Sequence, residues 1–300
     1  MKNNDVVIIG AGPAGISAAI QLKRYDIEPV LLEKGEVCGH LRDANLVENY
    51  PGFPEEISGK HLVSLFEQQF EKTGIKIQFE KVLNLDYKNS LFFITSDRKI
   101  FSSLIVIVAS GTEPRKPDFE IPTGTENRVF FGIRHLDYIR NKKIAIIGAG
   151  DIAFDYALNL SKRNNIVILN RQKKTKCLSV LWRRAVENNN ISYVESITLK
   201  SIKPHGNGLV LSLYNSDIRS EYEMHVSYLL FAIGRKLCLD FLSNNIKNNL
   251  EILQEMGILY MIGDINNGSY RQTAIAVGDG IKCAMKVYKK LRGKLNEGYS

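Results

Sequence analysis

The sequence has no long apolar run and no recognisable export signal. Stretches such as Leu104 to Ala109 have the length of a strand, far below the roughly 18 apolar residues that suggest a membrane span. The N-terminus shows no charged leader followed by an apolar stretch and a small-residue cleavage site. We therefore expect a cytoplasmic protein that does not enter a membrane.

Cysteine is scarce, and its spacing argues against two kinds of site. The 300 residues include four cysteines, which are Cys38, Cys177, Cys238 and Cys283. No two of them form a CxxC pair, so the sequence predicts neither a disulfide framework nor a zinc site. We expect no bound metal.

Acidic residues are outnumbered, and the formal net charge is +8. The lysines are mostly dispersed, which is typical of solvated faces. An alternative interpretation is attraction to an acidic partner, such as a small electron carrier or a polyanion. We expect no nucleic-acid partner.

The most informative feature present is an internal repeat. Residues 6–20 and 144–158 each read as a β-branched run, a glycine-rich turn and an apolar helix. Each helix leads to another apolar strand, at 29–32 and 166–169. The unit of a strand, a crossover helix and a parallel strand therefore occurs twice. This repeat predicts an α/β protein with two Rossmann-like domains.

Two stretches are expected to be linkers, and a last helix is expected near the C-terminus. The linkers are the proline-containing stretch 114–122, which follows the apolar strand ending at Thr112, and the polar run 243–249. The helix is predicted over 279–291.

The glycine-rich turns have the pattern of dinucleotide sites. The first position turns the chain tightly, the second lets the backbone approach a pyrophosphate at a helix N-terminus, and the third lets the helix pack on the strand. These positions are Gly10, Gly12 and Gly15 in the first copy and Gly148, Gly150 and Ala153 in the second.

The ends of the following strands distinguish the two ligands. The first ends in Glu33, whose carboxylate can accept hydrogen bonds from ribose hydroxyls, as the adenosine of FAD requires. The second runs into the basic stretch Asn170–Lys176, whose cations can pair with a 2′-phosphate. The sequence therefore favours NADPH over NADH. The alternative is a solvated basic loop without a ligand.

At this point the chain resembles the low-molecular-weight thioredoxin reductase group of flavoproteins, over nearly its whole length. The matching motifs are Gly10–Gly15, Val47–Phe53, Ala109–Arg115, Phe231–Arg235, Gly263–Asp264 and Tyr270–Ala274. The resemblance implies that the aspartate of the fifth motif lies on the ribitol and that the Arg-Gln segment of the sixth lies beside the flavin ring. It also implies a homodimer.

The glycine turns and the resemblance together predict the cofactor-binding residues. For FAD they are Gly10, Gly12, Pro13, Ala14, Gly15, Glu33, Lys34, Gly39, His40, Leu41, Asn49, Val82, Ala109, Ser110, Gly111, Gly263, Asp264, Arg271, Gln272 and Thr273. For NADPH they are Gly148, Gly150, Asp151, Ile152, Asn170, Arg171, Lys176, Ile233 and Gly234.

One departure from the family bears on function. Thioredoxin reductases carry a redox-active CxxC shortly before the second glycine motif, whereas residues 130–137 contain no cysteine. The chain is thus similar to the branch without this dithiol, which includes ferredoxin–NADP reductases. That branch carries a C-terminal extension with an aromatic residue over the flavin. We expect this chain, whose sequence ends at Ser300, to lack that extension.

Two residues beside the expected flavin site are candidate catalytic residues. Cys38 stands where the family has glycine, and a thiolate there could exchange electrons with the flavin. The alternative is a small buried residue that fills a glycine's place. His40 could donate a proton to reduced flavin or substrate.

We expect residues 1–114 and 247–300 to form the FAD domain and residues 115–246 the NAD(P)H domain. The function predicted is hydride transfer from NADPH to the flavin, followed by electron transfer to a protein carrier or small acceptor. The acceptor stays open, with ferredoxin or a disulfide as possibilities. The alternatives are a disulfide reductase working through Cys38 and a nucleotide-binding sensor without turnover.

Overall fold

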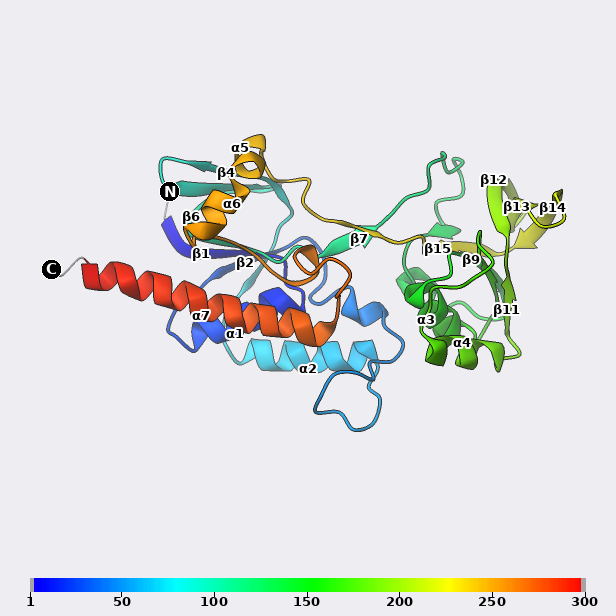
Figure 1. The fold of residues 1–300 in the computed structure, drawn as a ribbon, viewed down its shortest axis with the longest axis horizontal. Coiled ribbons are helices and arrows are strands. Elements are labelled where there is room, and N and C mark those ends of the chain that lie inside the picture. The colour runs from blue at the N-terminus through cyan, green and yellow to red at the C-terminus, as the bar shows by residue number, and fades with distance from the viewer. Residues whose placement is uncertain (1–2, 298–300) are drawn as a thin grey trace. The chain divides into compact units, whose positions relative to one another are not determined.

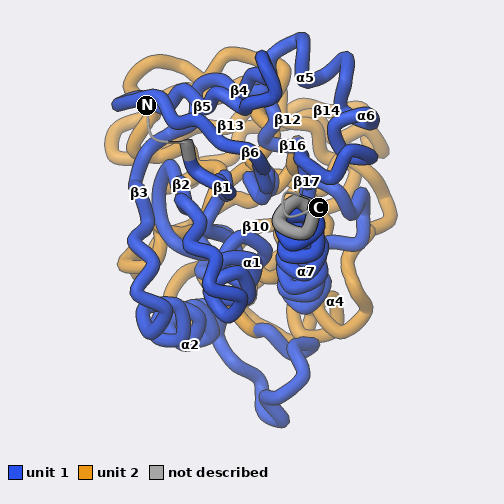
Figure 2. The backbone as a smooth tube through the Cα atoms, turned by 90° about the vertical axis from the view of Figure 1, so that its left-hand side faces the viewer, with its two compact units in different colours: residues 1–42, 47–112, 237–300 blue, residues 43–46, 113–236 orange. Residues whose placement is uncertain are grey.

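The computed structural model describes residues 3–297, and the chain forms two compact units. Unit 1 consists of residues 1–42, 47–112 and 237–300, and unit 2 of residues 43–46 and 113–236 (Figure 2). The segments that connect the units, β7 (Thr112–Pro114) and β16 (Arg235–Leu237), pair with each other. The second unit is therefore inserted into the first.

Unit 1 is built on a sheet with a parallel centre and an antiparallel extension. Its order is β3-β2-β1-β6-β5-β4, and β17 also pairs with β6. All pairs are parallel except those made by β4 and β5. The strands are β1 Asn3–Ile9, β2 Val30–Glu33, β3 Ile77–Phe79, β4 Val82–Lys88, β5 Leu91–Ser96, β6 Ile100–Val108 and β17 Leu259–Met261. Strand β6 is buried along most of its length, as expected for an apolar run covered on both faces.

Helices cover both faces of this sheet (Figure 1). On one side lie α1 (Pro13–Lys23), α2 (Gly59–Glu71) and α7 (Thr273–Glu297), and on the other α5 (Asn244–Asn248) and α6 (Leu250–Glu255). Two 3₁₀ turns are η1 (Leu41–Asp43) and η3 (Gly263–Ile265). Helix α7 begins earlier than the sequence predicted. No helix within residues 3–297 is long and apolar enough to span a bilayer.

The polar run 243–249 is not a linker, which corrects the expectation from sequence. The Ser243 side chain accepts a hydrogen bond from the Ile246 N–H and caps α5. Ile246 is fully buried in the core of unit 1 with residues of β4, β6 and β17. A side-chain cap and one buried residue therefore make a helix from a sequence that is otherwise polar.

Unit 2 is a parallel sheet covered by helices on one face and by a second sheet on the other. The parallel sheet has the order β11-β10-β9-β15-β8, and the antiparallel sheet has the order β12-β13-β14. The parallel strands are β8 Val129–Phe130, β9 Lys143–Ile147, β10 Asn165–Leu169, β11 Ile191–Val194 and β15 Tyr228–Phe231. The remaining elements are η2 Arg134–Leu136, α3 Asp151–Leu160, α4 Ser179–Val186, β12 Ile197–His205, β13 Gly208–Asn215 and β14 Ser220–Val226. The α/β class with two Rossmann-like folds is confirmed.

Candidate functional site

The turn between β1 and α1 is closed at two of its glycines and open at the third. Gly10 has φ +107°, and a Cβ on it would lie 2.4 Å from the carbonyl oxygen of Ala109. A Cβ on Gly15 would lie 1.9 Å from the carbonyl oxygen of Gly10. Gly12 has no atom within 4 Å of the place where its Cβ would stand. The turn therefore packs closely on the sheet and leaves space where a pyrophosphate is expected.

The N-terminus of α1 has the properties of an anion site. Gly12 is its N-cap and provides no side-chain cap, and Pro13 is its first residue. The first N–H groups of a helix lack partners within the helix and attract negative charge. This helix end therefore fits the phosphates of a dinucleotide.

Glu33, at the end of β2, is held by the same turn. Its Oε2 accepts a hydrogen bond of 2.8 Å from the Ala11 N–H, and its Oε1 accepts one of 2.9 Å from the Gly35 N–H. A carboxylate oxygen has two lone pairs, so each oxygen keeps one for a ribose hydroxyl. The adjacent Lys34 ammonium lies 3.3 Å from Sγ of Cys238.

The end of β6 completes this side of unit 1. The Ala109 N–H donates to the Ile9 carbonyl at 2.8 Å, which extends the pairing of β6 with β1. The Ser110 hydroxyl donates to the Cys238 carbonyl at 2.6 Å, and the Cys238 N–H donates to the Gly111 carbonyl at 3.1 Å. These bonds hold the segment after β16 against the predicted cofactor residues.

Three further predicted segments meet in unit 1. Gly263 packs on the first turn of α1, since a Cβ on it would lie 3.0 Å from the Ala14 Cβ. The Asn49 amide donates to Oε1 of Gln272 at 2.8 Å. Arg271 Nε is buried and has no hydrogen-bond partner in the part of the chain whose side chains are described, residues 4–293. A buried donor without an acceptor costs about 1–3 kcal/mol, which an acceptor on a ligand would remove.

The remaining predicted FAD-binding residues of unit 1 differ in how far their side chains are exposed. The Val82 side chain is buried in the hydrophobic core with Leu85 and Phe92, so only its backbone is available to a ligand. His40 is exposed, and Leu41 is buried. Thr273 is the first residue of α7.

Cys38 lies in a strained, buried turn. Its φ is +49°, the left-handed region that favours glycine, and the residue is 1% exposed. Its N–H donates to the Ala11 carbonyl at 2.8 Å, next to the first glycine turn. Burial, followed by the negative charge of Glu67, raises the pKa of the thiol to about 12. The thiol therefore stays protonated near neutral pH and is a poor nucleophile.

The turn between β9 and α3 in unit 2 repeats the first one. Gly148 has φ +119°, and a Cβ on it would lie 2.3 Å from the Ala232 carbonyl oxygen. Gly150 is the N-cap residue of α3, provides no side-chain hydrogen bond to the helix, and has open space where a Cβ would stand. Ala153 fills the third position and is fully buried. Gly234, with φ +105°, accepts a backbone hydrogen bond near the end of β15.

The basic loop after β10 folds back over this turn. The Thr175 hydroxyl and the Lys176 N–H both donate to the Ala149 carbonyl, at 2.7 and 3.1 Å. Asn170 is 6% exposed, and its amide donates to the Lys174 carbonyl and to the Tyr193 hydroxyl. The loop is therefore ordered by bonds to the site itself, unlike a solvated loop.

Within the loop, the exposed cations differ in availability. The Lys173 ammonium lies 3.0 Å from Oδ1 of Asp217, whose pKa is lowered by this contact. Arg171 and Lys176 are exposed, and neither forms a side-chain ion pair with the side chains described, those of residues 4–293. Asp151, also predicted as a contact, accepts from the Leu178 N–H at 2.8 Å. Arg171 and Lys176 are thus the cations best suited to a 2′-phosphate.

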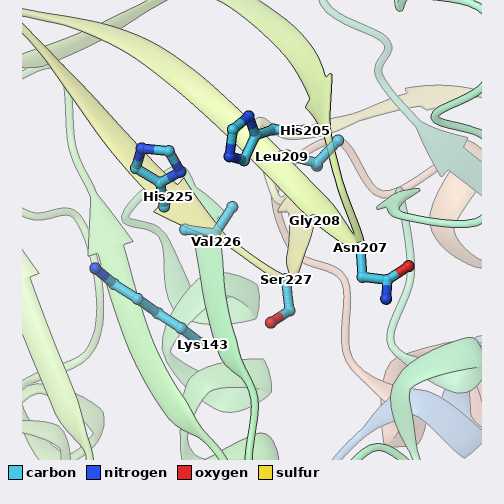
Figure 3. Close-up of a pocket in the computed structure, with 8 residues that line it drawn as sticks. All are labelled: Lys143, His205, Asn207, Gly208, Leu209, His225, Val226 and Ser227. Atoms are coloured by element: carbon cyan, nitrogen blue, oxygen red, sulfur yellow. The ribbon is translucent and has the colours of Figure 1, made fainter.

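A separate groove of ≈ 270 Å³ lies at the other end of the parallel sheet of unit 2 (Figure 3). Its lining includes Lys143, at the start of β9, and the rings of His205 and His225, whose centroids are 5.0 Å apart. Dinucleotides bind at the carboxyl ends of parallel strands, so this groove is not the nucleotide site. Among the described side chains, those of residues 4–293, no group of three or more potential ligands could hold a metal ion.

Sequence reasoning missed some residues that shape the site. Cys238, Asn267 and Asp279 contact predicted residues, but each is a single polar or sulfur-containing residue without a local motif. Their partners are backbone or side-chain groups brought close by folding, which leaves no pattern in the sequence.

The two glycine turns together fit FAD and NADPH, the two cofactors predicted from the sequence. In unit 1, FAD would meet the open position at Gly12, the remaining lone pairs of Glu33 and the unpartnered donor of Arg271. In unit 2, the open position at Gly150 and the ordered basic loop suit NADPH.

Comparisons with known proteins agree with this geometry. A family model described as pyridine nucleotide-disulphide oxidoreductase matches residues 4–280. Thioredoxin reductase 1, mitochondrial, of Arabidopsis thaliana is 28% identical, over 94% of this chain and 82% of that protein. Thioredoxin reductase of Chlamydia pneumoniae is 27% identical, over 95% and 98%.

Solved structures share the fold. Lactococcus lactis thioredoxin reductase has a TM-score of 0.84 at 26% identity, covering 97% of this chain and 99% of that one. The bacillithiol disulfide reductase of Staphylococcus aureus has a TM-score of 0.75 at 19% identity, over 98% and 99%, which shows the fold alone. The chain therefore belongs to the pyridine nucleotide-disulphide oxidoreductase family, as a thioredoxin reductase-like flavoprotein enzyme that uses FAD and NADPH.

Proposed function

We propose that this protein passes electrons from NADPH, through FAD, to an acceptor outside its own chain without a dithiol of its own. The observation that carries the proposal is the state of Cys38. It is the cysteine next to the first glycine turn, and it is buried with a pKa raised to about 12. The family's CxxC is absent from residues 130–137.

The residues of the chain have distinct roles in this proposal. In unit 1 the α1 N-terminus at Gly12 binds the FAD pyrophosphate, and Glu33 accepts from the ribose. In unit 2 the α3 N-terminus at Gly150 binds the NADPH pyrophosphate, and Arg171 and Lys176 bind its 2′-phosphate. When bound, the flavin supplies the chemistry that accepts a hydride and releases electrons.

An anaerobic titration tests the electron input. We expect a yellow protein whose visible flavin absorbance bleaches with NADPH and less readily with NADH. Cys38→Ser should bleach in the same way, because the thiol is not a nucleophile at neutral pH. A flavin that neither nucleotide bleaches would refute the proposal.

A panel of acceptors tests the electron output. The panel contains ferredoxin, flavodoxin, disulfides, quinones and oxygen. Disulfides belong on it because the related proteins are named thioredoxin reductases and bacillithiol disulfide reductases. Disulfide reduction that is lost in Cys38→Ser, with flavin bleaching intact, would favour a disulfide reductase working through Cys38. Absence of turnover with every acceptor would favour a sensor.

Three further parts of the proposal concern organisation. Unit 1 is the proposed FAD domain and unit 2 the proposed NADPH domain. The limits expected from sequence, 1–114 with 247–300 and 115–246, differ from the units mainly at residues 237–246, which belong to unit 1. The proposal also includes a cytoplasmic location and a homodimer, of which the family resemblance implies the homodimer. Sedimentation equilibrium tests the dimer, and a monomer at micromolar concentration would contradict it.

A further inference from the structure

A small polar cluster joins α7 to the turn that follows β17. Oδ2 of Asp279, on α7, accepts hydrogen bonds from the Gly263 N–H at 3.1 Å and from the Asn267 amide at 2.5 Å. The Asn267 amide also donates to the Gly263 carbonyl at 3.0 Å. Both backbone polar groups of Gly263 are therefore held by side chains.

The same part of α7 is locked to α1. A Cβ on Gly280 would lie 2.3 Å from the Ala14 carbonyl oxygen and 2.9 Å from the Ala18 nitrogen, so the two helix backbones touch there. Figure 1 shows α7 running alongside α1. Asp279 and Gly280 are neighbours, so one point of α7 holds both the start of α1 and the turn at Gly263.

These contacts bring together two segments that the FAD site needs. Gly263 has φ +71° and lies against Ala14 in the first turn of α1. The helix N-terminus is the expected pyrophosphate site, and Asp264 follows Gly263 directly. The position of Asp264 relative to the helix end therefore depends on how Gly263 is held.

We propose that Asp279 is a positioning residue for FAD, which acts by holding the Gly263–Asp264 turn at the N-terminus of α1. The inference rests on the proposed function, since it requires FAD to bind in unit 1. Asp279 uses Oδ2 for two protein donors and influences the cofactor through Gly263.

The helix itself gains nothing from this aspartate. Aspartate is a weaker helix former than alanine by a few tenths of a kcal/mol in a helix interior. A carboxylate is, however, a stronger acceptor than a neutral group for the Gly263 N–H. The aspartate therefore serves the turn and not the helix that carries it.

Two substitutions at one position separate positioning from bulk stability. Asp279→Ala removes the acceptor of both bonds, and we expect the FAD dissociation constant to rise by about tenfold. Asp279→Asn keeps one oxygen that can take the place of Oδ2 but loses the charge that strengthens both bonds, so we expect an affinity between those of the unchanged protein and Asp279→Ala. Lys282→Ala, at an exposed position of the same helix, is the matched control.

The measurements are FAD affinity of the apoprotein and the visible circular dichroism of bound flavin, with NADPH affinity as the internal reference. We expect Asp279→Ala to weaken FAD binding and change the flavin signal while NADPH affinity is unchanged. Equal FAD affinity and spectra in Asp279→Ala would overturn the inference, and so would an Asp279→Asn protein as defective as the alanine variant. An unchanged protein that binds no FAD would instead overturn the proposed function.

A second variant covers the case in which Asp279→Ala does not fold. Asn267→Ala leaves the bond from Gly263 to Asp279 and removes the other two. We expect FAD affinity to fall by about fivefold, which corresponds to about one neutral hydrogen bond. Unchanged FAD affinity both in this variant and in Asp279→Asn would overturn the inference.

Discussion

Gly12→Ala should separate cofactor binding from folding in unit 1. Gly12 has φ −73° and ψ −179°, which alanine adopts without strain, and the space where a Cβ would stand is empty. The added methyl group would instead occupy the approach of the FAD pyrophosphate to the helix N-terminus. The substitution therefore affects the ligand and not the apoprotein.

Two opposing effects set the change in apoprotein stability. Replacing glycine by alanine at a compatible position stabilises by about 0.4–1 kcal/mol, through the entropy of the unfolded chain. Alanine is a poorer N-cap than glycine, at a cost of about 0.5–1 kcal/mol. We expect the free energy of unfolding of the apoprotein to change by less than about 0.5 kcal/mol.

The effect on FAD is much larger. Hydrogen bonds to a charged group contribute about 1.5–3 kcal/mol each. Loss of two such bonds between backbone N–H groups and the pyrophosphate weakens FAD binding by at least about a hundredfold.

Gly150→Ala is the matched variant in unit 2. Gly150 has φ −95° and ψ −179° at the N-cap of α3, and it also has open space at its Cβ position. Urea unfolding of the apoprotein, flavin absorbance and NADPH calorimetry are measured on both variants. Gly12→Ala should lose FAD and Gly150→Ala should lose NADPH. If either apoprotein lost 2 kcal/mol or more of its free energy of unfolding, roughly the effect of a core substitution, the inference that both Cβ positions are empty would be refuted. Retention of both cofactors by both variants would refute the assigned sites.

Three other substitutions have expected outcomes. Gly15→Ala would place a Cβ 1.9 Å from the Gly10 carbonyl oxygen, so urea unfolding should show a loss of more than about 3 kcal/mol; a stable variant would show that the turn can shift. Asn170→Ala removes the amide that holds the basic loop, and calorimetry should show weaker NADPH binding and less preference over NADH, with FAD unchanged; equal discrimination would contradict the loop's role. Hydrogen bonding, first from Lys88, lowers the pKa of Asp86 from 3.8 to about 2. Its contribution to stability should be complete above about pH 4 and disappear as the pH falls through about 2, and Asp86→Asn should abolish that part of the pH dependence of unfolding.

Much of the framework could be predicted from local patterns. A strand, a glycine turn and a helix occupy neighbouring residues, so their signal lies within about fifteen positions of the chain. Both turns occur where the sequence predicted them, and the closed positions at Gly10 and Gly148 explain why glycine is required there. The apolar run within β6 likewise identified a central buried strand.

The environments of individual side chains could not be predicted in this way. The thiol of Cys38 was a candidate nucleophile in the sequence, and only its burial near Glu67 shows that it stays protonated. The run 243–249 appeared to be a linker because the pocket that buries Ile246 is made by distant strands.

The sequence by itself determined where the two nucleotide turns lie, because backbone conformation and helix ends depend on neighbouring residues, and it predicted which ligand each turn would bind. Only the tertiary structure brought Asn49 to Gln272, left Arg271 Nε buried without a partner and joined Asp279 to Gly263. Asn49 and Gln272 are separated by 223 positions in the sequence. The chemistry of such contacts depends on desolvation and on the distance between the groups, and both are set only when the chain has folded.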